Sequence, residues 1–202
     1  MKKIITFSLV LFVGIVCYGQ QKEGSELYFN WNLGAPVSNS FVKGFNGSGA
    51  NLGYNKFIQK NLSVGAAIGW NNYNTYYDRQ TYSNKTGAIT TDMYTYIFAL
   101  PVTLTATKYF DLGKIVSPYI KIGAGAMYSE QNQYYNIYQD GNNNWGFTAI
   151  PEIGARFDLV PGSKWSLNAS AQYLYATNKA SDYGLKNLKT LSANIGASWR
   201  FH

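Results

Sequence analysis

The stretch Asn194-Ile195-Gly196-Ala197-Ser198-Trp199-Arg200-Phe201, at the end of the chain, decides the fold. Apolar and polar residues alternate through it, and the alternation already begins at Leu191. A period of two puts successive side chains on opposite faces of a β-strand, so one face meets an apolar medium and the other a polar one. The stretch is therefore predicted to be the last strand of either a soluble sheet or a membrane barrel.

The same stretch resembles the C-terminal insertion signal of bacterial outer-membrane barrels. That signal combines a polar residue, a glycine and two aromatic residues at fixed spacing, and here they are Asn194, Gly196, Trp199 and Phe201. His202 departs from the pattern, because such chains usually stop at the last aromatic residue. The resemblance implies insertion by the barrel-assembly machinery into the outer membrane of a Gram-negative bacterium.

The N-terminus has the pattern of an export signal. Met1-Lys2-Lys3 is basic, Ile4 to Val16 is largely apolar, and small residues precede Gln20. This order of basic, apolar and small residues is typical of a cleaved signal peptide, and the apolar run is short for a transmembrane helix. We predict a signal peptide over residues 1–19 and one barrel domain over residues 20–202. The alternative is lipidation of Cys17, although a lipoprotein signal has a small residue where Val16 stands.

Composition limits the chemistry of the exported chain. Removing residues 1–19 takes away the single cysteine, so neither a disulfide nor a cysteine-ligated metal is expected. It also lowers the formal charge from +7 to +5, because Lys2 and Lys3 are lost. The remaining Lys and Arg residues are scattered, which argues against a nucleic-acid partner. No cofactor is predicted.

Eight segments of roughly ten residues share this alternation and are separated by turn residues. They are residues 26–34, 49–57, 62–70, 94–104, 120–128, 147–157, 165–175 and 191–201. The connections after the even-numbered segments are short, whereas those after the odd-numbered ones are long and polar, at 36–48, 71–91, 129–144 and 177–189. This asymmetry predicts an all-β, eight-stranded, antiparallel up-and-down transmembrane barrel with both termini in the periplasm.

The apolar faces distinguish a membrane barrel from a soluble one. A soluble barrel turns its apolar face inward and covers its outside with Lys and Glu. Here the polar faces consist mostly of Gly, Ser, Asn and Thr, which suits a narrow interior. The apolar faces carry aromatic residues near both ends, as at two bilayer interfaces. These residues are Trp70, Tyr128, Phe147 and Tyr175 on the loop side, and Phe157, Trp165, Trp199 and Phe201 on the turn side.

Two prolines fall inside predicted strands. Pro101 and Pro151 cannot donate to a strand ladder, and a closed barrel has no edge to place them on, so a β-bulge is predicted at each.

Pro101 also lies in a recognisable segment. Residues 94–104 followed by Lys108-Tyr109-Phe110, then Pro118-Tyr119-Ile120 and Gly123-Ala124-Gly125, resemble the small porin-like outer-membrane barrels common in Bacteroidetes. These barrels have the architecture of OmpA, OmpX and OmpW. The resemblance covers essentially the whole exported chain and implies an architecture without a fixed activity.

Histidine content argues against an enzyme. The only histidine is His202, at the end predicted to be periplasmic, so no Ser-His pair can form in the loops. The remaining enzymatic alternatives are an acylation enzyme and a site built from carboxylates alone, using Asp78 and Asp92. Scattered carboxylates also predict no metal site.

Charged residues on the inward faces form a candidate lumen network. The predicted members are Lys121, Glu152, Arg156, Asp158 and Arg200. Glu152 and Arg156 share one strand face and Lys121 faces them, while Asp158 and Arg200 form a second group nearer the turns. One interpretation is a paired plug, since unpaired buried charge is costly. The other is a gate that lets ions through a narrow pore.

Tyrosine and asparagine crowd the two longest connections. The candidate contact residues are Tyr76, Tyr77, Tyr82, Tyr134, Tyr135 and Tyr138. Such side chains suit binding loops, but tyrosine also favours strands, and the preferred interpretation is that the hairpins simply extend above the membrane. We predict a non-enzymatic protein with a structural or surface-interaction role. A narrow channel, or lateral passage of an apolar ligand near Pro101 or Pro151, is the alternative.

Predicted partners follow from this location. They are outer-membrane lipids and lipopolysaccharide around the barrel, the assembly machinery during insertion, and an external ligand or host surface at the loops. The barrel is expected to be a monomer.

Overall fold

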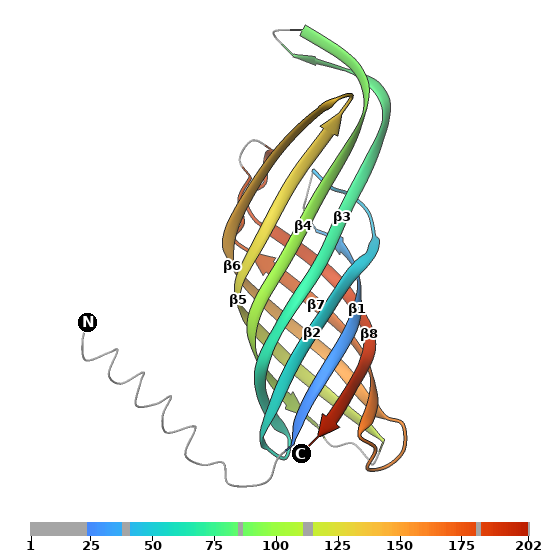
Figure 1. Cartoon of the computed structure of the whole chain (residues 1–202), viewed down its shortest axis with the longest axis vertical. Helices are drawn as coiled ribbons and strands as arrows, with labels where there is room; N and C mark the ends of the chain where they lie inside the picture. Colours follow the sequence, from blue (N-terminus) through green and yellow to red (C-terminus); the bar gives the residue numbers. More distant parts are fainter. Residues whose placement is uncertain (1–23, 38–40, 85–86, 111–114, 181–182, 202) are drawn as a thin grey trace, which may run out of the picture.

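Eight antiparallel strands close into a single barrel, as predicted (Figure 1). The structure is a computed structural model that describes residues 24–37, 41–84, 87–110, 115–180 and 183–201; the predicted signal peptide, Gln20 and His202 lie outside them. The strands are β1 (Ser25–Pro36), β2 (Asn46–Gln59), β3 (Leu62–Asn84), β4 (Gly87–Tyr109), β5 (Val116–Tyr135), β6 (Tyr138–Asp158), β7 (Trp165–Ala176) and β8 (Leu188–Phe201). Each pairs with its neighbour in sequence, and β8 pairs with β1 to close the ring.

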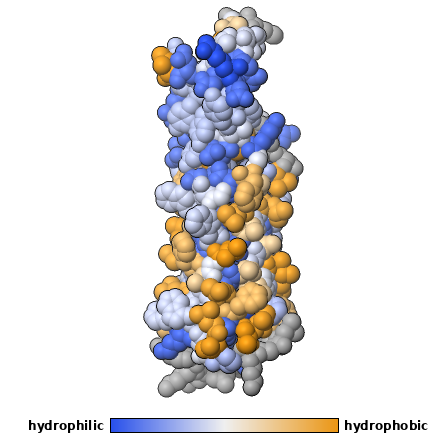
Figure 2. All heavy atoms as spheres, turned by 90° about the vertical axis from the view of Figure 1, so that its right-hand side faces the viewer, coloured by the Kyte–Doolittle hydropathy of each residue, from blue (hydrophilic) through white to orange (hydrophobic). Residues whose placement is uncertain are grey.

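The barrel buries its polar residues and exposes its apolar ones. On β1, Glu26 and Asn30 are buried, whereas Phe29 on the alternate face is 54% exposed. Figure 2 shows the consequence, an apolar band over the lower part of the molecule below a hydrophilic upper part. This is the reverse of a soluble barrel and is the arrangement of a protein surrounded by lipid. Within the described ranges, no helix is long and apolar enough to cross a membrane.

Four strands are much longer than the membrane requires. A barrel strand crosses a bilayer with about 9–11 residues, yet β3 and β4 each contain 23 residues and β5 and β6 contain 20 and 21. The excess projects beyond the barrel as a tall sheet, in which the hairpin β3–β4 reaches furthest (Figure 1). We call the part of β3, β4, β5 and β6 beyond Trp70, Phe98, Tyr128 and Trp145 the extension sheet.

The predicted loops at 71–91 and 129–144 are therefore wrong. The β3–β4 pairing continues to Asn84 and Gly87, and the β5–β6 pairing continues to Tyr135 and Tyr138. Cross-strand hydrogen bonds satisfy the backbone N–H and C=O groups there, so these segments form strands without being surrounded by lipid. The preferred interpretation, that the hairpins extend as strands, is confirmed by this pairing.

The predicted bulges at the two prolines are also wrong. The β3–β4 pairing skips two positions at Pro101 and resumes in the same register, and the β6–β7 pairing does the same at Pro151. A proline removes one donor without adding a residue, so the ladder opens locally while the pairs on both sides hold the register. The irregularities recorded in the pairing lie elsewhere, at Asn32–Gly34, Phe57–Gln59 and Tyr77–Gln80.

The two remaining long connections fold over the mouth of the barrel. Phe41 and Val42, between β1 and β2, are buried beside Ala180 and Leu185, which lie between β7 and β8. The ring of Phe41 stacks on that of Tyr183 with centroids 4.5 Å apart. These residues pack on apolar side chains that point inward from the strands, namely Tyr73, Ile97, Ala99, Met127, Leu174, Ala176 and Leu188. We call this cluster the apolar plug.

Candidate functional site

A charged cluster fills the lumen near the turn end of the barrel. Glu26 Oε2 accepts from Arg156 Nη1 at 3.5 Å and from Arg200 Nε at 3.3 Å. Arg156 Nε also donates to Asp158 Oδ1 at 3.1 Å. The other oxygen of Glu26 accepts from the hydroxyl of Tyr109. The two carboxylates and the two guanidinium groups of this cluster therefore neutralise one another, as buried charges must.

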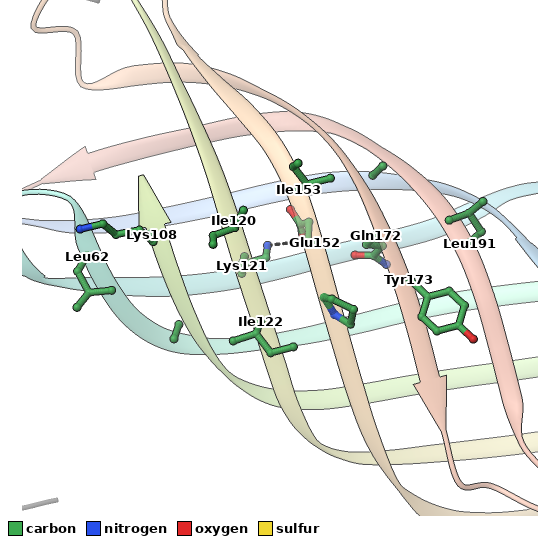
Figure 3. A pocket seen from close by; sticks show the side chains of 13 residues that line it. Leu62, Lys108, Ile120, Lys121, Ile122, Glu152, Ile153, Gln172, Tyr173 and Leu191 are labelled. Atoms are coloured by element: carbon green, nitrogen blue, oxygen red, sulfur yellow. Dashed lines mark ion pairs between the residues drawn. The ribbon is translucent and has the colours of Figure 1, made fainter. Parts of the chain in front are cut away.

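Lys121 and Glu152 form a second pair deeper in the lumen. Lys121 Nζ lies 2.7 Å from Glu152 Oε2, and both side chains are nearly inaccessible to solvent (Figure 3). The hydroxyl of Tyr119 donates to Glu152 Oε1 at 2.7 Å, and Lys121 Nζ lies over the ring of Tyr28 at 4.6 Å. Both members of the pair thus have further polar or aromatic partners.

The structure brings the five predicted lumen residues into these two groups and adds one that the sequence interpretation omitted. Arg156 pairs directly with Asp158 and shares Glu26 with Arg200, instead of pairing with Glu152. Glu26 could have been found, because it shares the inward face of the first segment with Tyr28 and Asn30. It was missed because it stands at the beginning of the segment, where strand boundaries are hardest to predict.

The interior leaves little free space between these groups. Two lumen cavities, one beside Pro101 and one between Glu26 and Lys121, have volumes of about 20 and 10 Å³. A cavity of that size holds about one water molecule. Thr107 lines the second cavity, and its buried hydroxyl has no hydrogen-bond partner among the described residues, so it suits such a water. The lumen is therefore filled by side chains, with room for single waters.

A wide apolar groove lies on the outer face of the barrel over Pro151. It has a volume of about 610 Å³, and Ile120, Ile122, Ile153, Tyr173 and Leu191 line it (Figure 3). Lys121, Glu152 and Gln172 also line it, so the lumen residues close its floor. The groove faces the surrounding hydrocarbon, and Lys121, Glu152 and Gln172 line both the groove and the small lumen cavity beside Pro101.

An aromatic belt marks the loop-side limit of the apolar band. It runs around four neighbouring strands as Trp70, Phe98, Tyr128 and Trp145, and successive ring centroids lie 5.1, 6.4 and 5.4 Å apart. Aromatic residues of this kind collect at the interface between hydrocarbon and headgroups. The extension sheet begins immediately beyond this belt.

The six candidate contact tyrosines all lie on strands of the extension sheet and not on loops. Tyr76, Tyr134 and Tyr138 are exposed, whereas the other three, Tyr77, Tyr82 and Tyr135, are half-buried. Tyr76 donates its hydroxyl to Asp92 Oδ2 at 3.1 Å, and this hydrogen bond raises the pKa of its phenol. Asp92, one member of the carboxylate pair considered for catalysis, is thus engaged by a tyrosine.

The predicted insertion-signal residues lie on β8 beside β1 and β7. Gly196 packs where any side chain would strike the carbonyl of Phe29, so the β1–β8 contact needs glycine. The rings of Trp199 and Phe201 lie 4.9 Å apart, and Trp199 also stacks on Trp165 of β7. Their role during insertion stays a prediction.

These features define a transmembrane β-barrel with eight strands, a filled lumen and an enlarged sheet at its loop end. The chain belongs to the family of the outer membrane protein β-barrel domain, whose model matches residues 8–201. Its location is accordingly an outer membrane, and such membranes belong to Gram-negative bacteria. The narrower affiliation with Bacteroidetes stays a prediction.

Solved structures share this fold at low sequence identity. Neisserial surface protein A is 16% identical, with a TM-score of 0.52 over 88% of this chain and 97% of that one. The outer membrane protease OmpT from Escherichia coli is 7% identical, with a TM-score of 0.54 over 88% of this chain and 96% of that one. At such identities the likeness concerns the fold alone. No curated protein matches the chain. Within the described ranges, no three acidic, histidine or cysteine side chains converge as a metal site would require.

Proposed function

We propose that this barrel is a non-enzymatic scaffold that presents the extension sheet for contacts at the cell surface. The single observation that supports this role most strongly is the combination of a filled lumen with four strands that continue far beyond the membrane. A protein that served only to span the membrane would need neither the length of β3 nor that of β4. In this proposal the turn end faces the periplasm and the extension sheet faces outward.

The extension sheet has two edges available for contacts. In the described strand pairs, β2 accompanies β3 only as far as Asn72, and β7 accompanies β6 only from Thr148 onward. The backbone of Lys43 hydrogen-bonds the hydroxyl of Thr75, and Asn178 and Lys179 hydrogen-bond Asn144. Among the described residues, no strand pairs with these two edges from Tyr76 outward on β3 or from Asn143 outward on β6. An unpaired strand edge offers backbone donors and acceptors to an incoming extended chain.

The register allows the projecting hairpin to be shortened cleanly. Tyr77 pairs directly with Met93, so replacing residues 78–92 by Asn-Gly joins a directly opposed pair through a two-residue turn. Cells that display the full-length barrel should attach to immobilised mucin or fibronectin, and cells with the shortened hairpin should attach at the level of cells lacking the protein. A control with Tyr76→Ser and Tyr82→Ser keeps both strands and separates side-chain contacts from edge contacts. Equal attachment by the full-length and shortened barrels would refute the proposal.

Two alternatives have weaker physical support. A narrow channel conflicts with the small lumen cavities and with the apolar plug at the mouth. Lateral passage is favoured by the groove over Pro151 but would require the ion pair of Lys121 and Glu152 to separate.

A further inference from the structure

A polar hollow lies on the outward face of the extension sheet, between β5 and β6. Its volume is about 400 Å³, and it is lined by Glu130, Asn132, Gln139, Gly141, Asn142 and Asn143. Pairing places Glu130 opposite Asn143 and Asn132 opposite Gly141, so these side chains come from adjacent strands onto one face. Gly141 lets the side chain of Asn132 lie across β6, because a side-chain carbon at Gly141 would strike Asn132 Oδ1.

The hollow has the hydrogen-bonding character of a sugar site. Each amide of Asn132, Gln139 and Asn143 offers both donors and acceptors, and so does each sugar hydroxyl. The carboxylate of Glu130 adds a strong acceptor that the hydroxyl of Tyr128 holds in place at 2.7 Å. Such adaptable, mixed polarity matches a ligand covered with hydroxyl groups better than it matches a hydrocarbon.

Aromatic rings stand at the two ends of the same face. Trp145 is 65% exposed beside Tyr128, and Tyr134 lies at the other end, where Gln139 Nε2 approaches its hydroxyl at 3.4 Å. Exposed rings of this kind pack against the apolar C–H faces of a sugar while their polar atoms stay hydrated.

Charge indicates which sugars would fit. Among the six lining residues there is one charged group, the carboxylate of Glu130, and there is no cation. A phosphate or sulfate would be repelled by that carboxylate and would find no basic partner in the lining. The hollow therefore suits uncharged sugar residues.

The position of the hollow relative to the aromatic belt indicates which sugars it would meet. Tyr128 and Trp145 belong to the aromatic belt, and Glu130 and Asn143 are the next residues outward on the same face. In the orientation proposed above, that position lies immediately beyond the outer leaflet. We propose that this hollow binds uncharged sugar residues of the lipopolysaccharide that surrounds the barrel. The assignment rests on the proposed orientation but not on attachment through the β3–β4 hairpin.

The test uses the full exported chain folded in detergent and a core oligosaccharide freed from lipid A and phosphate. Saturation-transfer NMR should show contact between this oligosaccharide and the barrel. Asn132→Ala and Asn143→Ala should each weaken binding about 2- to 10-fold, as expected for the loss of a hydrogen bond, and Gly141→Val, which fills the hollow, should abolish it. Asn74→Ala changes an exposed asparagine on β3 outside the hollow and should leave binding unchanged.

Three outcomes would overturn the proposal. They are equal binding by Asn132→Ala and wild type, stronger binding of a heparin oligosaccharide than of the core oligosaccharide, and binding of dextran without binding of the core oligosaccharide. The barrel shortened at residues 78–92 keeps the hollow, so it should bind the sugar normally even if it no longer attaches. Failure of the sugar site and failure of the attachment role are therefore distinguishable.

Discussion

Glu26 is the residue on which the turn end of the lumen depends. Its two oxygens accept from side chains on four other strands, namely Asn55 of β2, Tyr109 of β4, Arg156 of β6 and Arg200 of β8. Its side chain is almost completely buried, so these partners replace the water that a free carboxylate would bind. Removing its charge would leave Arg156 with Asp158 as its remaining anionic partner.

We expect Glu26→Gln to destabilise the barrel by about 3 kcal/mol, because breaking a buried ion pair leaves an uncompensated charge. Urea unfolding in lipid vesicles, followed by tryptophan fluorescence and by heat-modifiable migration, measures the change. Asp140→Asn, on the exposed part of β6, is the matched control and should leave the midpoint unchanged. A Glu26→Gln barrel as stable as wild type would show that solvent or a neighbour compensates for the lost charge.

At the scale of strands, the sequence predicts the part of each element that lipid surrounds. Alternation arises because hydrocarbon and lumen demand opposite polarities, so it ends where both faces meet water. The predicted ends at residues 70, 128 and 147 accordingly lie at or beside the aromatic belt, although β3, β5 and β6 continue well beyond it. The strands continue because cross-strand pairing and the strand preference of residues such as Tyr76 and Tyr134 stabilise the hairpins above the belt. Neither effect requires apolar and polar residues to alternate.

The contacts between residues far apart in the sequence could not be predicted, because they depend on how the strands are staggered and on how the connections fold. The five lumen charges could be placed on inward faces by parity, but their partners depend on strand stagger, which parity does not determine. The apolar plug was not predicted at all. Phe41 and Val42 lie in a connection without periodicity, and nothing local shows that they pack on residues near Tyr183.

The connection between β1 and β2 contains two phenylalanines, and replacing only one of them should weaken the apolar plug. Phe41 is buried and stacks on Tyr183, whereas Phe45 is 71% exposed. We expect Phe41→Ala to loosen both connections, because it leaves a cavity in a packed cluster, and to speed hydrogen exchange and proteolysis at residues 36–46 and 177–188. Phe45→Ala should change neither. Equal protection in the two variants would mean that the connections are held by their backbone hydrogen bonds instead.

At the scale of the whole molecule, two barriers lie in series along the lumen. The apolar plug closes the loop end, and the paired charges of Lys121, Glu152, Arg156 and Glu26 fill the region toward the turns. An ion crossing the barrel would first lose its hydration among apolar side chains and then displace a paired charge, and both steps are costly. Removal of either barrier leaves the other in place.

Planar-bilayer recordings of the folded chain from Gln20 to His202 should therefore be silent. Glu152→Gln alone and Phe41→Ala alone should also give no discrete steps, because each leaves one barrier intact. A barrel with Phe41→Ala, Tyr183→Ala, Lys121→Ala and Glu152→Ala removes parts of both barriers and should give small, reproducible steps. Steps from the wild type would show that the plug opens spontaneously, and steps from Glu152→Gln alone would make the ion pair a gate. If a folded four-fold variant is silent, the main barrier lies instead among buried asparagines such as Asn30, Asn32 and Asn71, between the apolar plug and the charged groups.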